Sequence, residues 1–240
     1  MGTANVAAIV PAAGEGRRLG GRVRKPFVRL HGAPLLLHAL QALQACAAIR
    51  WIIVVVADGE RARVARLLTR HRVTKALAPC AGGSSRAESV ARGFAALPSR
   101  ARWVLIHDGA RPCIGAPLIA RALASAKRWG AVACGLPASL TVKAVDERQL
   151  VRVTLDRERL WLAQTPQVFR REWLAEALQR ADGALVEFPD DAALVEAAGF
   201  PVRMILGDPF NVKVTTREDL VLAEAIVAER ISTRHTARCG

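Results

Sequence analysis

The sequence predicts an α/β fold, namely a doubly wound, mostly parallel sheet with helices on both faces and an extended β-hairpin arm. Short apolar runs, typical of strands buried on both faces, alternate along the chain with amphipathic helical segments. Residues 138–160 break this pattern, because apolar and polar residues alternate there as in a hairpin with one exposed face. At 240 residues we expect a single domain over residues 1–231 and a frayed tail over 232–240.

The composition limits the class of protein. Apolar residues make up 52% of the chain, which argues against disorder. Apolar runs are far shorter than a membrane span of about 20 residues, and the N-terminus lacks a signal-peptide pattern, so we expect a cytoplasmic protein outside the membrane. The five cysteines are scattered without CxxC spacing, which favours reduced thiols.

The formal net charge of +14, from 35 basic and 21 acidic residues, indicates acidic partners. A nonenzymatic nucleic-acid-binding protein is one alternative. However, the arginines are spread through predicted helices and loops, without a basic run or a zinc finger. We therefore expect small phosphorylated ligands and no nucleic acid.

The first predicted strand, Val6–Val10, leads into a loop rich in glycine and arginine. Pro11 ends the strand, because proline cannot donate to a ladder. Small residues then allow backbone amides to approach phosphate oxygens, and cationic side chains follow. The small residues are Ala12, Ala13, Gly14 and Gly16, and the cations are Arg17, Arg18 and Lys25.

Two commoner glycine loops do not fit this stretch. Gly14, Gly16 and Gly20 have GxGxxxG spacing, one residue longer than the dinucleotide-binding fingerprint. Arg22 and Val23 stand where a Walker A loop needs Lys and Ser or Thr. An ordinary glycine-rich turn between strand and helix remains the structural alternative.

The chain continues as a βαβαβ unit. Leucines at helical spacing predict a helix over Pro34–Cys46, and Trp51–Ala57 is a second buried strand. Asp58 is expected to cap a basic helix that ends near Arg70, and Val73–Ala78 to form a third strand. Such units place a ligand crevice at the carboxyl ends of their strands.

The segment Ala81–Val90 is predicted to be a loop that opens a helix. Ser85 and Glu88 have capping-box spacing, which would be a purely structural role. The glycine pair Gly82 and Gly83 also allows a functional role, because backbone donors at a helix N-terminus can meet nucleotide oxygens or a base edge.

A fourth strand, Trp103–His107, delivers Asp108 and Arg111 at its carboxyl end. The acid is suited to ribose or to the hydration shell of magnesium, and the arginine to a phosphate. A surface ion pair between the two is the structural alternative. A helix over Pro117–Trp129 and a strand over Ala131–Leu136 are expected next.

The hairpin arm is predicted from Leu140–Val145 and Leu150–Leu155. Because an extended hairpin has nothing to pack on within its own domain, we expect a homodimer through this arm. The remaining predicted elements are helices over Arg171–Arg180 and from Asp190 and Asp191 to Ala198, strands over Pro201–Leu206 and Asn211–Thr215, and a last helix from Thr216 and Asp219 to about Ile231.

Motifs between residues 11 and 215 resemble those of the sugar-phosphate nucleotidyltransferases, and in particular the 2-C-methyl-D-erythritol 4-phosphate cytidylyltransferases. They are PAAGEGRRLG with KPF, HDGARP, TVK, LDRERLW, TPQ and NVKVT. The resemblance implies transfer of a cytidylyl group from CTP to a sugar-alcohol phosphate. It also implies Mg²⁺ or another divalent cation bound with CTP, and a homodimer with interlocking arms.

The resemblance also assigns roles to individual residues. Arg18 and Lys25 would stabilise the reacting phosphoryl group and the leaving pyrophosphate, while Arg157 and Lys213 would hold the acceptor in line. Asp108 is a candidate metal ligand, helix stabilisation is favoured over metal binding for Asp190 and Asp191, and no metal site is assigned. The expected nucleotide-binding residues are Ala12, Ala13, Gly14, Gly16, Gly82, Ser89 and Asp108, and the expected acceptor-binding residues are Arg111, Thr141 and Thr165.

Three residues depart from the family pattern. Leu140 stands where the family usually has an acid, Pro189 where it often has a threonine, and Pro26 where a polar residue is common. The first two fall on the acceptor side of the site. They keep open the alternative of a ribitol 5-phosphate cytidylyltransferase, which shares the fold and the nucleotide half.

Overall fold

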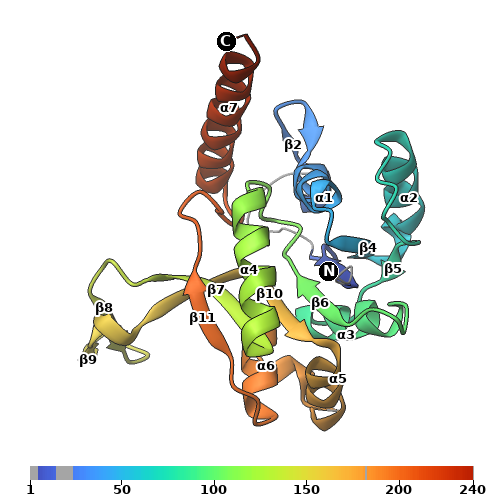
Figure 1. Cartoon of the computed structure of the whole chain (residues 1–240). Helices are drawn as coiled ribbons and strands as arrows, with labels where there is room; N and C mark the ends of the chain where they lie inside the picture. The colour runs from blue at the N-terminus through green and yellow to red at the C-terminus, as the bar shows by residue number, and fades with distance from the viewer. Residues whose placement is uncertain (1–4, 15–23, 182, 240) are drawn as a thin grey trace.

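The computed structural model describes residues 5–14, 24–181 and 183–239. Its centre is a seven-stranded sheet in the order β11-β7-β10-β6-β1-β4-β5 (Figure 1). β10 is antiparallel to both of its neighbours, and the other neighbouring pairs are parallel. The strands are β1 (Val6–Pro11), β4 (Ile49–Val56), β5 (Cys80–Ala81), β6 (Trp103–Ile106), β7 (Ala131–Pro137), β10 (Trp161–Arg170) and β11 (Arg203–Leu206).

Helices cover both faces of this sheet, which confirms the predicted fold class. Alternate residues of β1 show why, because Val6 and Ala8 pack into one apolar cluster while Ala7 and Ile9 pack into the other. The first cluster includes side chains of α1 (Leu35–Ala45), α2 (Arg61–Arg70) and α4 (Ala116–Trp129). The second includes those of α3 (Arg86–Ala95), α5 (Arg171–Arg180) and α6 (Asp191–Ala197).

The C-terminal helix α7 (Arg217–Cys239) packs on a smaller third cluster. Ala223 and Ile226 meet Leu30 there, which belongs to the two-stranded sheet of β2 (Arg29–Leu30) and β3 (Ala33–Pro34). The far end of α7 projects away from the sheet (Figure 1). Within the described ranges, every helix is too short or too polar to span a bilayer.

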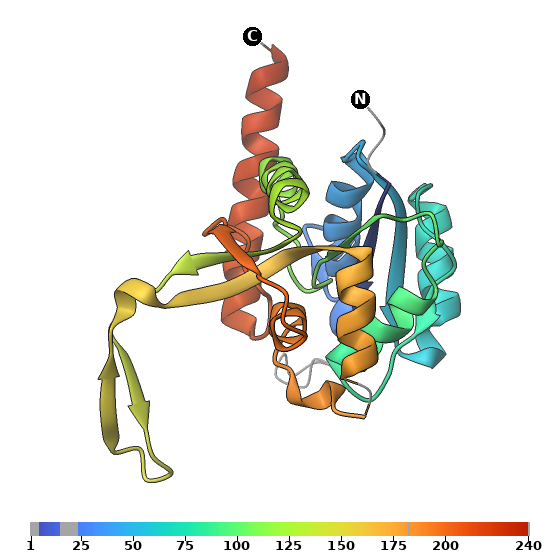
Figure 2. The ribbon, with the colours of Figure 1, turned by 60° about the horizontal axis from the view of Figure 1, so that its bottom comes forward.

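The predicted arm is present as a separate two-stranded antiparallel sheet of β8 (Val142–Val145) and β9 (Val151–Leu155). It extends well away from the domain (Figure 2). Val151, Val153 and Leu155 alternate along β9 and therefore lie on one face, and all three are exposed. An apolar stripe of this kind is unusual on a surface that faces water.

Two predicted strands were wrong. The chain turns within 71–75, where Arg72 has a positive φ, so that Val73–Ala78 makes one bridge to Ile52 and the strand forms later as β5. Residues 211–215 form no strand, because Val214 N donates to Ala110 O in the loop after β6 and not to a neighbouring strand.

Other boundaries differ in smaller ways. Asp58 starts a short 3₁₀ turn, η3 (Asp58–Glu60), and pairs with Arg61 without capping α2. β10 was not predicted as a strand, since Pro166 interrupts its pattern, and a register shift between Gln164 and Gln167 lets the sheet pass this proline. α7 continues beyond the expected end at Ile231.

Candidate active site

An open cavity of about 620 Å³ lies at the carboxyl ends of β1 and β6, where the fold class predicts a ligand. Four segments and one further lysine form its walls. They are Pro11–Gly14 after β1, Lys25 and Pro26 in the 3₁₀ turn η2 (Lys25–Phe27), Gly83–Arg86 with Ser89 around the start of α3, Asp108–Ala110 after β6, and Lys213.

The loop after β1 and the loop before α3 touch each other because Gly82 has no side chain. A Cβ on Gly82 would lie 2.6 Å from the Cβ of Ala13 and 2.9 Å from Oγ of Ser89, which is closer than real contacts allow. Gly82 itself does not line the cavity, whereas its neighbour Gly83 does. The glycine therefore brings together the two loops that form the walls.

The start of α3 combines a cap with a brace. Ser85 Oγ accepts from Glu88 N at 3.0 Å, which confirms the predicted cap. The Glu88 carboxylate accepts a hydrogen bond from Ser84 N at 2.6 Å, one residue before the N-cap amide of Ser85 that a capping box would use. Ser89 Oγ donates to Ser85 O and accepts from Gly83 N, so Ser89 fixes the conformation of the loop before α3.

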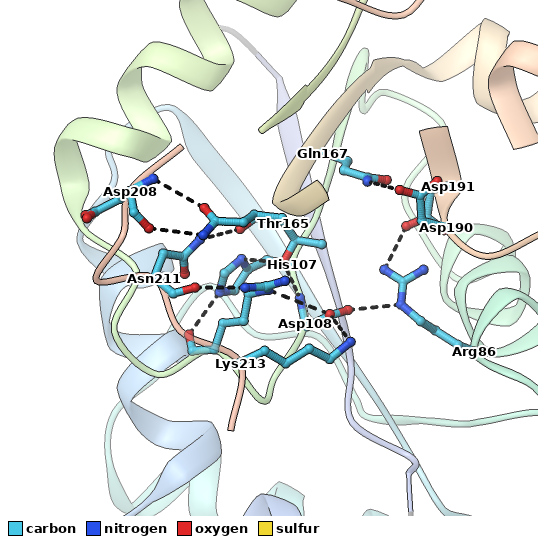
Figure 3. A network of polar contacts seen from close by, with 12 residues as sticks. Arg86, His107, Asp108, Thr165, Gln167, Asp190, Asp191, Asp208, Asn211 and Lys213 are labelled. Carbon is cyan, nitrogen blue, oxygen red and sulfur yellow. Dashed lines mark hydrogen bonds and ion pairs between the residues drawn. The ribbon is translucent and has the colours of Figure 1, made fainter. Parts of the chain in front are cut away.

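Asp108 is the charged centre of the site and is only 6% exposed. Its Oδ1 accepts from Nε of Arg86 at 3.0 Å, and its Oδ2 lies 2.8 Å from Nζ of Lys213 (Figure 3). Burial alone would raise the pKa of this carboxyl, but the charges of Arg86 and Lys213 outweigh burial and hold the pKa well below its usual value. Asp108 is therefore an anion that fixes two cations.

His107, directly before Asp108, is buried and neutral. Burial lowers the pKa of its imidazole to about 4. Its Nε2 is 3.1 Å from Arg111 O, which can only accept, so the single proton lies on Nε2. Thr165 Oγ1 then donates to Nδ1 of His107 and accepts from Asp108 N, so this relay fixes the backbone of Asp108.

Arg111 is also buried, and burial lowers the pKa of its guanidinium. Nη1 donates to Asn211 O at 2.8 Å, while Nε lies 3.9 Å from Oδ2 of Asp108, beyond hydrogen-bond length. Among the described residues, Nε of Arg111 and Oδ1 of Asn211 are buried without a hydrogen-bond partner. Such buried donors and acceptors are costly to leave unpaired.

A second cavity of about 320 Å³ adjoins the first. Arg86, Asp108 and Lys213 line both cavities and form their shared wall. The remaining lining residues of the second cavity are Arg111, Ala163, Gln164, Thr165, Gln167, Pro189 and Asp190. Two adjoining cavities whose shared wall carries the two cations Arg86 and Lys213 suit two anionic ligands that react with each other.

A family model described as 2-C-methyl-D-erythritol 4-phosphate cytidylyltransferase matches residues 6–229. The chain belongs to this family. A relative of that name from Desulforamulus reducens is 40% identical over 227 residues, which cover 94% of this chain and 97% of the relative. Another from a Synechococcus species is 42% identical over 223 residues, which cover 92% and 99%.

Solved structures of the cytidylyltransferase family have the same fold. The enzyme from Thermus thermophilus is 34% identical, with a TM-score of 0.74 and coverage of 92% of this chain and 97% of that one. The 4-diphosphocytidyl-2C-methyl-D-erythritol synthase from Anaerococcus prevotii is 26% identical, with a TM-score of 0.82 and coverage of 93% and 96%.

The structure brings together most of the residues that the cytidylyltransferase motifs predict. Ala12, Ala13, Gly14, Lys25, Ser89, Asp108 and Lys213 line the larger cavity, and Arg111 and Thr165 line the smaller one together with Asp108 and Lys213. Gly16 and Arg18 fall outside the described residues.

Arg157 and Thr141 are not brought to either cavity within one chain. Both are exposed near the base of the arm, and Nη1 of Arg157 donates to Ser139 O at 3.0 Å. Arg157 begins the 3₁₀ turn η4 (Arg157–Arg159), between β9 and β10. Their roles at the acceptor stay predictions.

Arg86 is a charged site residue that sequence reasoning missed. It is the first residue of α3, directly after the Ser85 cap, so its position beside a suspected ligand loop was visible. Its two carboxylate partners, Asp108 and Asp191, lie 22 and 105 residues further along the chain. Only the fold brings the three side chains together.

Proposed function

We propose that the chain transfers the cytidylyl group of CTP to 2-C-methyl-D-erythritol 4-phosphate at the two adjoining cavities. The products are 4-diphosphocytidyl-2-C-methyl-D-erythritol, an isoprenoid precursor, and pyrophosphate. As a member of its family the chain is a nucleotidyltransferase. The observation that carries the assignment is the wall of Arg86, Asp108 and Lys213 that both cavities share.

CTP is assigned to the larger cavity. Small residues at Ala12, Ala13 and Gly14 leave backbone amides accessible to the triphosphate, and Lys25 adds a cation on the same side. The start of α3 lines the same cavity, where backbone donors of Gly83 and its neighbours suit the cytidine. By resemblance, Arg18 joins Lys25 on the phosphates.

The acceptor is assigned to the smaller cavity. Arg111 lines this cavity, and its guanidinium, which Asn211 O holds through Nη1, is suited to a phosphate. Lys213 and Thr165 stand beside it in the same cavity. A phosphate held there would lie next to the shared wall, and therefore next to the α-phosphate of CTP.

The reaction needs alignment and charge stabilisation more than proton transfer. An oxygen of the acceptor phosphate attacks the α-phosphorus of CTP, and the bond from that phosphorus to the oxygen bridging toward the β-phosphate breaks, so pyrophosphate leaves. The nucleophile is already ionised at neutral pH, so no general base is required. Lys25, Arg18 and Lys213 counter the charge that builds up during the attack.

Mg²⁺ fits this site as an ion carried by the triphosphate. Among the described residues, no three His, Cys, Asp or Glu side chains are grouped to hold a metal, and both oxygens of Asp108 already meet cations. Mg²⁺ keeps several waters and binds largely through substrate phosphates in such sites. When bound, it would neutralise part of the charge on the leaving pyrophosphate.

We further propose a homodimer in which the arm of one protomer lies against its partner. The exposed stripe of Val151, Val153 and Leu155 would be buried there. Arg157 and Thr141, at the base of the arm, would then reach the acceptor cavity of the partner. This arrangement accounts for two family motifs that a single chain leaves in solvent.

The test is product formation by the purified chain with CTP, Mg²⁺ and one acceptor at a time. We expect 2-C-methyl-D-erythritol 4-phosphate to give one pyrophosphate per molecule of cytidylylated product, identified by mass. Ribitol 5-phosphate, offered in parallel, tests the alternative that Leu140 and Pro189 raise. Turnover of ribitol 5-phosphate alone would move the chain to that activity, and turnover of neither would overturn the assignment.

A further inference from the structure

Arg86 connects parts of the site that belong to different substrates in the proposed reaction. Its side chain lines both cavities. Nε donates to Oδ1 of Asp108 at 3.0 Å, and Nη2 donates to Oδ2 of Asp191 at 2.9 Å (Figure 3). One planar guanidinium therefore joins the start of α3 to the loop after β6 and to the start of α6.

Asp191 has no place in either cavity, yet it is a buried carboxylate. It is 1% exposed, and its carboxylate accepts from Arg86. A buried carboxylate that loses its partner is costly, so this contact restrains the guanidinium strongly. The side chain of Asp191 therefore contacts Arg86 but lines neither cavity.

The start of α6, which carries Asp191, is itself fixed to the central sheet. Asp190 caps α6 through Ala193 N and accepts from Nε2 of Gln167 at 2.7 Å. Oε1 of Gln167 accepts from Ala192 N at 3.0 Å, and Gln167 belongs to β10. Gln167 contacts the residues on both sides of Asp191, which leaves the Asp191 carboxylate little room to follow a moving arginine.

We propose that Asp191 and Arg86 are a positioning pair for the proposed cytidylyl transfer. Asp191 holds the guanidinium in the orientation in which it also fixes the Asp108 carboxylate between CTP and the acceptor. The inference rests on the proposed function, because that function places Asp108 between the two substrates. Asp191 touches neither substrate in this assignment and acts only through Arg86.

A purely structural role for Asp191 would predict something different. In that case the Asp191→Asn substitution would lower the melting temperature, while the folded enzyme kept its kinetics. A positioning role predicts that kcat/KM for the acceptor falls about tenfold or more in the folded variant, since small displacements in a site are costly to rate. Val195→Ala, on the buried face of α6, is the matched control and should lose stability without that kinetic loss.

The decisive measurement is a double-mutant cycle on kcat/KM with Asp191→Asn, Arg86→Lys and the double variant. Lysine keeps the charge but has a single ammonium group, so it cannot bridge both carboxylates as the planar guanidinium does. If Asp191 acts through Arg86, the double variant should match Arg86→Lys to within about twofold. Losses that multiply in the double variant would overturn the proposal.

The same set of variants covers two further outcomes. Should Asp191→Asn fail to fold, Arg86→Lys with wild-type kcat/KM would by itself refute the positioning role, and a reduced value would support it. All variants are compared with wild type, so an inactive wild type would refute the proposed function. An active wild type with an unaffected Asp191→Asn variant would refute only this inference.

Discussion

Asp108 illustrates how neighbours decide the role of one side chain. Its sequence position suggested a ribose ligand or a metal ligand, and the surface pair with Arg111 was the structural alternative. In the fold its closest cations are Arg86 and Lys213, while Arg111 lies farther away at 3.9 Å. Arg111 lines the smaller cavity, which the proposed function assigns to the acceptor.

Lys25 is the cation whose loss should affect chemistry most directly. It lines the larger cavity beside Pro26, at the start of the turn that follows the glycine-rich loop. We expect Lys25→Ala to lower kcat by about a hundredfold, the scale seen when a preorganised donor to a developing negative charge is removed.

The measurement is steady-state pyrophosphate release, with folding checked by circular dichroism. Lys127→Ala, an exposed lysine on α4, removes the same charge far from the cavity and serves as control. Wild-type turnover in folded Lys25→Ala would remove this residue from the mechanism.

His107 should make the stability of the fold depend on pH. Its folded pKa of about 4 lies below the ordinary value of 6.5, so only the unfolded chain takes up this proton between those values. The contribution is therefore complete above pH 6.5 and declines as the pH falls toward 4, by about 1.4 kcal/mol per pH unit. Below pH 4 both states are protonated and the contribution is gone.

We expect the free energy of unfolding of wild type to fall by about 2 kcal/mol more than that of His107→Asn between pH 7.5 and pH 5. Urea denaturation at both values measures this, and the other histidines cancel in the difference. Equal losses in the two proteins would show that His107 is not held neutral in the fold.

Among the elements, those with a strict periodicity were predicted well. The parallel strands near the centre of the sheet, the helix over α4 and the hairpin arm follow directly from apolar runs, 3.6-residue spacing and alternation. β10 escaped prediction because Pro166 breaks its pattern, and the sheet accommodates this proline only through a register shift. Residues 211–215 have the composition of a strand, but Val214 N donates to Ala110 O in the loop after β6, and Asn211 N donates to Asp208 O.

The arm gives a prediction about assembly. Val153 is 48% exposed on the apolar stripe of β9, so a charge there should oppose burial against a second protomer. We expect wild type to sediment as a dimer and Val153→Glu to shift toward monomer in analytical ultracentrifugation at the same concentration.

Activity should fall together with dimerisation, because Arg157 and Thr141 would no longer reach a partner cavity. Val221→Glu places the same charge on an exposed valine of α7 and should leave the dimer intact. A monomeric wild type, or a monomeric Val153→Glu variant with full activity, would contradict the assignment of the arm.

In the molecule as a whole, motifs far apart in sequence meet at one edge of the sheet. The carboxyl ends of β1, β4 and β6 point the same way, so the loops after β1 and β6 come together without any local signal. The sequence could therefore predict the larger cavity from the fold class. It could not predict the shared wall, because that depends on how the side chains of three separate segments meet.

The most direct test of the two-cavity arrangement is a crystal structure with the product 4-diphosphocytidyl-2-C-methyl-D-erythritol bound. We predict cytidine in the larger cavity near Gly83, the methylerythritol in the smaller cavity near Thr165, and the diphosphate beside Arg86, Asp108 and Lys213. A product that lies wholly in one cavity, or away from the shared wall, would contradict the account.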